Sequence, residues 1–270
     1  FHIPLNKRGI VSTQRYSSLG YPCLYLGNSI YSCWEEMRRP AFNNLMFSAY
    51  KVRNPFRVFD MRIPGDSDYF PDRLIQTIRR IPLVLACGFV VNNYRDVFKP
   101  EYIISQLLLD TIICDSRRRT QREKSVIDLD VIWGVLYTST HISDDFPYGK
   151  HLLENIVLPV IESNKSSNHC YYLASLFDIS KPSCYEYESL KENTSRMFWD
   201  TIDEEKTASE KVRQQYAQSK LGYLEERLKT AQFETLPHIM VGCPTDGITL
   251  DWTGSPVCVE VRSNDHFIIE

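Results

Sequence analysis

The chain has 270 residues, a formal net charge of -3 and 43% hydrophobic residues. This length allows a large buried core, and the small net charge gives no global reason to expect binding to nucleic acid or to an anionic membrane. The longest apolar run, 81–91, contains Pro82 and is far shorter than the ~20 residues that span a bilayer. We therefore expect a cytoplasmic protein that binds neither nucleic acid nor membrane.

The first forty residues are expected to form two extended segments around a turn. Segment 7–17 alternates loosely, and 23–26 is a short apolar strand. Gly20 lies between them and indicates a turn. A hairpin centred on this glycine would place Arg15 opposite Tyr25 on one face.

A helix is predicted to follow this hairpin. Asn28 and Ser29 are good N-cap residues, and Pro40 ends the helix after about residue 39. Ser32 and Glu36 are four residues apart, so they share one face of the helix.

The rest of the chain intersperses strands and helices, which indicates a mixed α and β class. Strands are predicted over 56–63, 83–91, 131–139, 155–161 and 171–179, and a core helix covers 103–112. Pro159 places its strand at an edge or a bend.

We expect one catalytic domain over residues 1–270, with its core over about 1–200. A charged helix over 201–235 and C-terminal strands over 236–270 are predicted as an appendage.

Several common catalytic and binding motifs are absent from the sequence. It has no phosphate-binding loop, no G-x-G-x-x-G, no H-E-x-x-H and no G-x-S-x-G. The eight cysteines form no C-x-x-C pair and the six histidines are scattered, so no metal site is expected. Polar residues remain that lie on or beside apolar elements: Arg15, Tyr25, Glu36, Ser139 and Asn155. A single buried polar residue usually makes a core hydrogen bond, so only the joint pattern points to a site.

This joint pattern resembles the RES domain, which is named for its Arg, Glu and Ser. The matching residues are Arg15, Gly20, Pro22, Leu24-Tyr25-Leu26, Glu36, Tyr137-Thr138-Ser139 and Asn155-Ile156-Val157-Leu158-Pro159. Two further segments, 1–4 and 102–108, are similar to the longer RES proteins that carry an additional N-terminal domain. The resemblance covers roughly residues 1 to 160.

The resemblance implies an ADP-ribosyltransferase-like α/β fold, with a central mixed or antiparallel sheet and flanking helices, that degrades NAD+. Glu36 would stabilise the positive charge on the ribose as nicotinamide leaves. Arg15 would hold the pyrophosphate, and Tyr25 would stack on the nicotinamide or orient the ribose. Ser139 and Asn155 would fix the nicotinamide amide or bind the incoming phosphate or water. NAD+ is the substrate, inorganic phosphate is a candidate co-substrate, and no cofactor is implied.

The family acts as toxins, so the resemblance implies a toxin or anti-phage effector that depletes NAD+ as a phosphorylase or glycohydrolase. These roles predict that Arg15→Ala and Glu36→Gln each abolish NAD+ loss without unfolding the protein, whereas Glu35→Gln is mild. An antitoxin or an upstream domain would restrain the toxin, and a homo-oligomer is expected.

Three alternatives stay open. The enzyme could transfer ADP-ribose to a macromolecule. The chain could be a non-catalytic nucleotide-binding or interaction module. Arg15 and Glu36 could also form a plain structural ion pair.

Overall fold

Nine strands of the described residues form a mixed sheet at the centre of the protein. The computed structural model describes residues 1–63, 74–122, 131–140, 153–161, 168–191, 214–235, 258–261 and 266–269. In spatial order the strands are β7 (Phe233–Thr235), β6 (Phe177–Ser180), β2 (Ser48–Val52), β9 (His266–Ile269), β1 (Cys23–Gly27), β5 (Glu154–Pro159), β4 (Ile132–Thr138), β3 (Phe56–Met61) and β8 (Cys258–Val261). All neighbours are antiparallel except β3 and β4, which run parallel. The predicted mixed α/β class with a mixed sheet is therefore confirmed.

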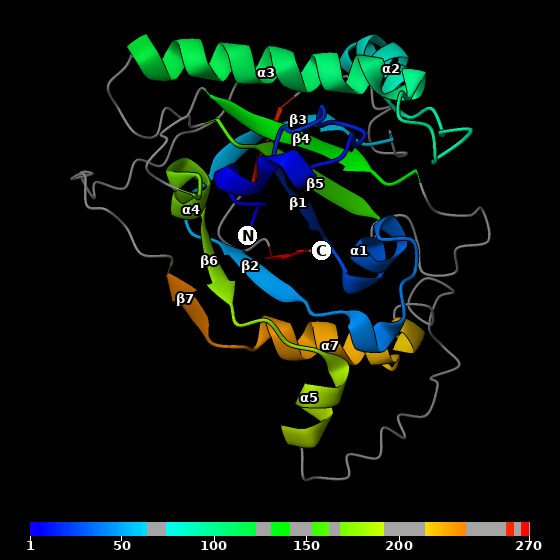
Figure 1. The fold of residues 1–270 in the computed structure, drawn as a ribbon, viewed down its shortest axis with the longest axis vertical. Helices are drawn as coiled ribbons and strands as arrows, with labels where there is room; N and C mark the ends of the chain where they lie inside the picture. The colour runs from blue at the N-terminus through cyan, green and yellow to red at the C-terminus, as the bar shows by residue number, and fades with distance from the viewer. Residues whose placement is uncertain are drawn as a thin grey trace.

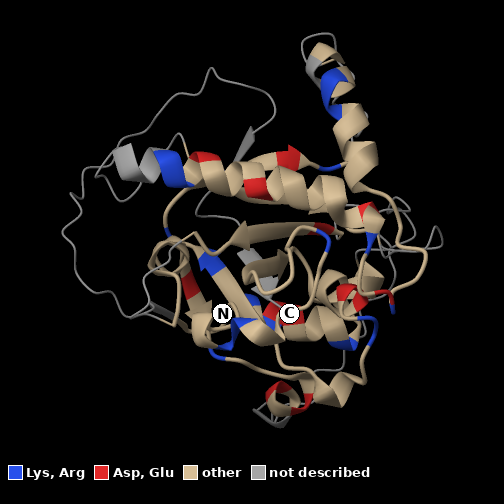
Figure 2. Cartoon of the chain, turned by 45° about the horizontal axis from the view of Figure 1, so that its top comes forward, with Lys and Arg blue, Asp and Glu red and all other residues tan. Residues whose placement is uncertain are grey.

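Helices flank the sheet (Figure 1 and Figure 2). The described helices are η1 (Leu5–Ile10), α1 (Ile30–Glu36), η2 (Phe42–Asn44), α2 (Leu74–Cys87), η4 (Pro100–Tyr102), α3 (Ile103–Arg122), α4 (Tyr171–Leu176), α5 (Tyr185–Lys191) and α7 (Lys220–Lys229). Helices α2 and α3 lie along β3 and β4, α1 packs on the central strands β1 and β9, and α7 packs against α1, α5 and β2. None of the helices in the described ranges is both long and apolar enough to cross a membrane.

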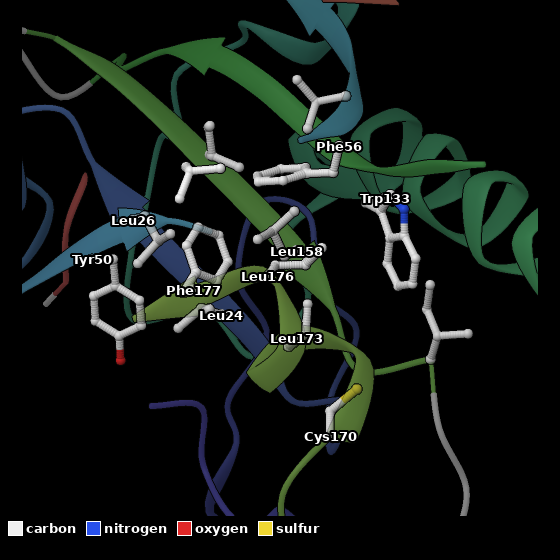
Figure 3. Packing of buried hydrophobic residues seen from close by; sticks show 14 of the residues in the cluster. Leu24, Leu26, Tyr50, Phe56, Trp133, Leu158, Cys170, Leu173, Leu176 and Phe177 are labelled. Carbon is white, nitrogen blue, oxygen red and sulfur yellow. The ribbon is translucent and has the colours of Figure 1, made fainter. Parts of the chain in front are cut away.

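Hydrophobic side chains from both halves of the chain form the core of the sheet. Figure 3 shows Leu24 of β1 and Leu158 of β5 packing with Phe177 of β6 in the largest cluster. The strand β4 is buried at all its central positions, so its sequence reads as a continuous apolar run. β4 and β5 approach so closely at Gly134 that an added Cβ would lie 2.0 Å from the Val157 carbonyl oxygen. This contact sets the spacing of the two strands that lead into the candidate site.

The predicted N-terminal hairpin is wrong. Residues 5–10 form the 3-10 helix η1, and β1 pairs with β5 and β9 instead of with 7–17. The turn at Gly20 does exist, because this glycine has φ 75° and its N–H donates to the Val11 carbonyl. The turn could be predicted from its local sequence. The pairing of β1 could not, because its partner β5 lies more than a hundred residues away along the chain.

Two of the predicted strands belong wholly or partly to helices. The apolar run 83–91 contains the end of α2, and 171–179 divides into α4 and β6. Short apolar runs do not distinguish a helix from a strand by periodicity alone, which explains both errors. Pro159 was expected to place its strand at an edge or a bend. Strand β5 lies between β1 and β4, and this interior position is possible because Pro159 is its last residue.

The described parts of the C-terminal segments pack into the sheet and against helix α1. Strand β9 lies inside the sheet, between β2 and β1. Helix α7 packs against α1, and its Leu224 and Leu228 join Ile30 and Cys33 in one buried cluster. The carboxylate of Glu225 accepts hydrogen bonds from the first backbone N–H of α1 and from the Tyr216 hydroxyl. The remaining parts of 201–235 and 236–270 lie outside the described residues.

Candidate functional site

Helix α1 presents Ser32 and Glu36 to strand β5, as its spacing predicted. The Ser29 side chain caps the helix by accepting the Ser32 N–H at 3.0 Å. The Ser32 hydroxyl donates to the Asn155 Oδ1 at 2.7 Å, and the Asn155 Nδ2 donates to the Glu36 Oε1 at 2.7 Å. One asparagine on β5 therefore bridges two residues that lie one turn apart on α1.

A second side chain holds the same carboxylate oxygen. The Ser139 hydroxyl donates to the Glu36 Oε1 at 2.6 Å. The backbone N–H of Ser139 donates to the Leu153 carbonyl, which continues the β4–β5 pairing beyond the end of β4. Two strands thus orient Glu36 from residues that are far away in sequence. The structure brings Glu36, Ser139 and Asn155 together as the sequence predicted.

The close packing of β1 on α1 requires a glycine at the end of β1. An added Cβ at Gly27 would lie 2.7 Å from the Cys33 Sγ and 3.2 Å from the Asn155 Oδ1. Because real Cβ atoms are not found at the shorter of these distances, a larger residue would push α1 or Asn155 away. Gly27 therefore supports the geometry that Glu36 needs.

Arg15 is near the site, but its guanidinium already has partners within the protein. Its Nη1 donates to the carbonyl oxygens of Cys87 at 2.7 Å and Phe89 at 2.9 Å, and its Nη2 donates to the Thr140 Oγ1 at 2.6 Å. It lies 5.2 Å from the Tyr102 ring centroid and is only 7% exposed. These contacts tie the N-terminal segment to the end of α2, so much of the donor capacity expected for a pyrophosphate is used internally.

Tyrosines line the site between Arg15 and Glu36. The Tyr25 hydroxyl lies 3.0 Å from the Ser17 hydroxyl, which places the ring at the cavity wall. Tyr16 and Tyr137 pack with their ring centroids 4.7 Å apart. Burial raises the pKa values of Tyr16 and Tyr102 above the ordinary value of a phenol, so both side chains stay neutral at physiological pH.

These residues surround a cavity of about 450 Å³, a volume typical of small-molecule sites. Its lining includes Arg15, Tyr25, Glu36, Arg38, Tyr94 and Tyr102. Ser139 and Asn155 are 6% and 3% exposed, and they contact Glu36. Their buried positions favour a role in positioning the carboxylate over direct contact with a ligand.

Sequence reasoning missed the far wall of this cavity. Residues 94–97, Lys99 and Tyr102 form it, and Arg38 lies near Glu36 at the end of α1. The signal was present, since Asn92 and Asn93 indicate a turn that is followed by aromatic and basic residues. It was overlooked because the preceding run 83–91 was assigned to a strand.

Over 208 residues the chain is 35% identical to a protein of Bacillus subtilis (strain 168) named "Putative toxin YopC". The similarity covers 72% of this chain and 44% of that protein, so this chain spans less than half of the length of the curated relative that it matches. No family model matches the chain, and no solved structure matches it. Over most of its length, the chain is thus similar to a protein that is named as a toxin.

Proposed function

We propose that the protein cleaves the nicotinamide–ribose bond of NAD+, as a phosphorylase or a glycohydrolase, and that it acts as a toxin by depleting this dinucleotide. The observation that carries the proposal is the carboxylate of Glu36, which two buried side chains hold at the wall of a cavity of about 450 Å³. The resemblance to RES domain proteins and the name of the Bacillus subtilis relative support the toxin role.

The chemistry suits a single oriented carboxylate. When the ribose–nicotinamide bond breaks, its electron pair goes to the ring nitrogen and neutralises the pyridinium, so the leaving group needs no proton. The ribose is left with an oxocarbenium-like positive charge, which Glu36 would stabilise. Ser139 and Asn155 hold the oxygen of Glu36 in place before the charge develops, and such preorganisation contributes most in a site that excludes water.

The acceptor decides which reaction results. Inorganic phosphate attacking the anomeric carbon yields ADP-ribose-1″-phosphate, whereas water yields ADP-ribose and a proton. Tyr25 and Tyr137 line the cavity beside Glu36 and offer aromatic faces on which the nicotinamide ring would stack. A toxin of this kind needs restraint, which an antitoxin or a further domain of a longer polypeptide would supply by covering the cavity.

Product analysis tests the proposal. The purified chain is incubated with NAD+, with and without inorganic phosphate, and the products are separated by chromatography. Nicotinamide with ADP-ribose-1″-phosphate is expected for the phosphorylase, and nicotinamide with ADP-ribose for the glycohydrolase. ADP-ribose attached to a macromolecule would point to a transferase, and NAD+ that stays intact under all conditions would contradict the proposal.

A further inference from the structure

Helix α1 ends in a backbone conformation that arginine rarely adopts. Arg38 and Arg39 have φ values of 64° and 53°, in the left-handed region that favours glycine. The Arg39 N–H donates to the Trp34 carbonyl and the Arg38 N–H to the Glu35 carbonyl, both at 2.9 Å, which is the hydrogen-bond pattern of a Schellman cap. Residues with a Cβ are strained there, and such strain is concentrated at functional sites.

A buried carboxylate holds this strained turn in place. Glu35 is 4% exposed, and both of its oxygens accept from the Arg39 Nε, at 3.0 and 2.9 Å. The Arg39 Nη2 lies 2.8 Å from the Glu35 Oε1. Because Arg39 is bound back onto α1, the turn is fixed and Arg38 is presented at the cavity. The two adjacent carboxylates therefore have different environments, since Glu35 holds the turn and Glu36 faces the cavity.

The Arg38 side chain differs from that of Arg15 in its contacts. Its guanidinium carbon lies 4.1 Å from the centroid of the Tyr94 ring, and both residues line the cavity with Glu36. Within the described part of the chain, no carboxylate or carbonyl binds the Arg38 guanidinium, whereas two carbonyls bind that of Arg15. A guanidinium stacked on a ring keeps its N–H edge available for bidentate bonds to phosphate oxygens.

We infer that Arg38 is the diphosphate-binding residue of this site, held by the Glu35–Arg39 pair and by stacking on Tyr94. The inference rests on the proposed function and narrows the substrate class to nucleotides that carry a diphosphate next to the ribose that is cleaved. The inference thus gives to Arg38 the diphosphate-binding role that the sequence pattern assigned to Arg15. Arg95 and Lys99 also line the cavity, and the inference assigns the diphosphate contact to Arg38 and not to these two cations.

Arg38→Gly tests this inference, because glycine keeps the left-handed turn and removes only the side chain. The melting temperature of the variant is expected to equal or exceed that of the wild type, since the strain is relieved. The KM for NAD+ is expected to rise about tenfold to hundredfold, as for a lost charge-assisted hydrogen bond, with kcat changed little. Arg95→Ala removes an exposed cation from the same cavity and serves as the control. An equal loss in both variants would show general electrostatic attraction and overturn the inference.

A binding measurement separates this inference from the proposed function. ADP-ribose is titrated calorimetrically into the full chain carrying Glu36→Gln, and into the same chain with Arg38→Gly added. A tenfold or greater loss of affinity on adding Arg38→Gly supports the diphosphate site, even if the wild type releases no nicotinamide. Equal affinities would overturn the inference while leaving NAD+ cleavage intact, and a lack of binding to either chain would overturn it as well.

Discussion

At the scale of single residues, the guanidinium of Arg15 joins separate parts of the chain. It binds the carbonyls of Cys87 and Phe89, just at and beyond the end of α2, and the hydroxyl of Thr140, just beyond β4. These contacts support the wall that carries Tyr102 and the 94–97 segment. Arg15 therefore has a structural role, because its hydrogen bonds hold the residues around the cavity in place.

Arg15→Ala is therefore expected to lower stability as well as activity, which differs from the intact fold that the sequence alone predicted. The substitution leaves buried carbonyls without a donor and should lower the free energy of unfolding by about 3 kcal/mol. Urea denaturation monitored by circular dichroism measures this loss. Arg15→Lys retains the charge but not the planar fork, so an intermediate loss is expected. An unchanged urea midpoint for Arg15→Ala would show that these contacts contribute nothing.

At the scale of elements, the sequence predicted best what depends on local spacing. The shared face of Ser32 and Glu36 on α1, the helix α3 and the strand β4 all follow from periodicity and capping, and all are present. The partners of β1 could not be predicted, because β5 and β9 are separated from it by long stretches of chain and register has no local signal. Arg38 was missed for a related reason, since its strained conformation arises from the Glu35–Arg39 contact.

The pairing of β4 with β5 gives a prediction at this scale. Gly134→Ala would place a Cβ 2.0 Å from the Val157 carbonyl oxygen, so the two strands must separate. We expect the free energy of unfolding to fall by roughly 3 kcal/mol or more, or the protein to become insoluble. Gly9→Ala is the matched control, because an added Cβ there meets no atom within 4 Å. Equal urea midpoints for Gly134→Ala and the wild type would contradict the described pairing.

At the scale of the whole molecule, distant segments complete the sheet and its covering layers. The N-terminal segment packs on the main core, where the buried His2 Nδ1 donates to the Ile3 carbonyl and its Nε2 accepts the Cys170 N–H at 2.8 Å. This arrangement requires a neutral imidazole. The candidate site likewise depends on α1, β4 and β5 together, so global stability and activity are linked.

The stability of the fold is expected to decrease in mild acid because of this histidine. Burial lowers the pKa of His2 to about 4 from the ordinary value of 6.5. Between these two pH values the unfolded chain binds a proton that the folded chain excludes, so stability falls as the pH falls from 6.5 toward 4, by at most about 3 kcal/mol. His2→Gln retains an acceptor for the Cys170 N–H and does not titrate. Its urea midpoint should therefore vary less than that of the wild type between pH 7 and pH 4.5, and an identical pH dependence would contradict the assignment.

The most direct measurement is the rate of nicotinamide release from NAD+ by the wild type, Glu36→Gln and Glu35→Gln. Glu36→Gln keeps the size of the side chain and removes the charge, so release should fall about 100-fold or more. Glu35→Gln weakens the ion pair with Arg39 that holds the turn at Arg38, so it should raise the KM for NAD+ but retain most of kcat. Release by Glu36→Gln at the wild-type rate, or no release by the wild type at all, would contradict the account.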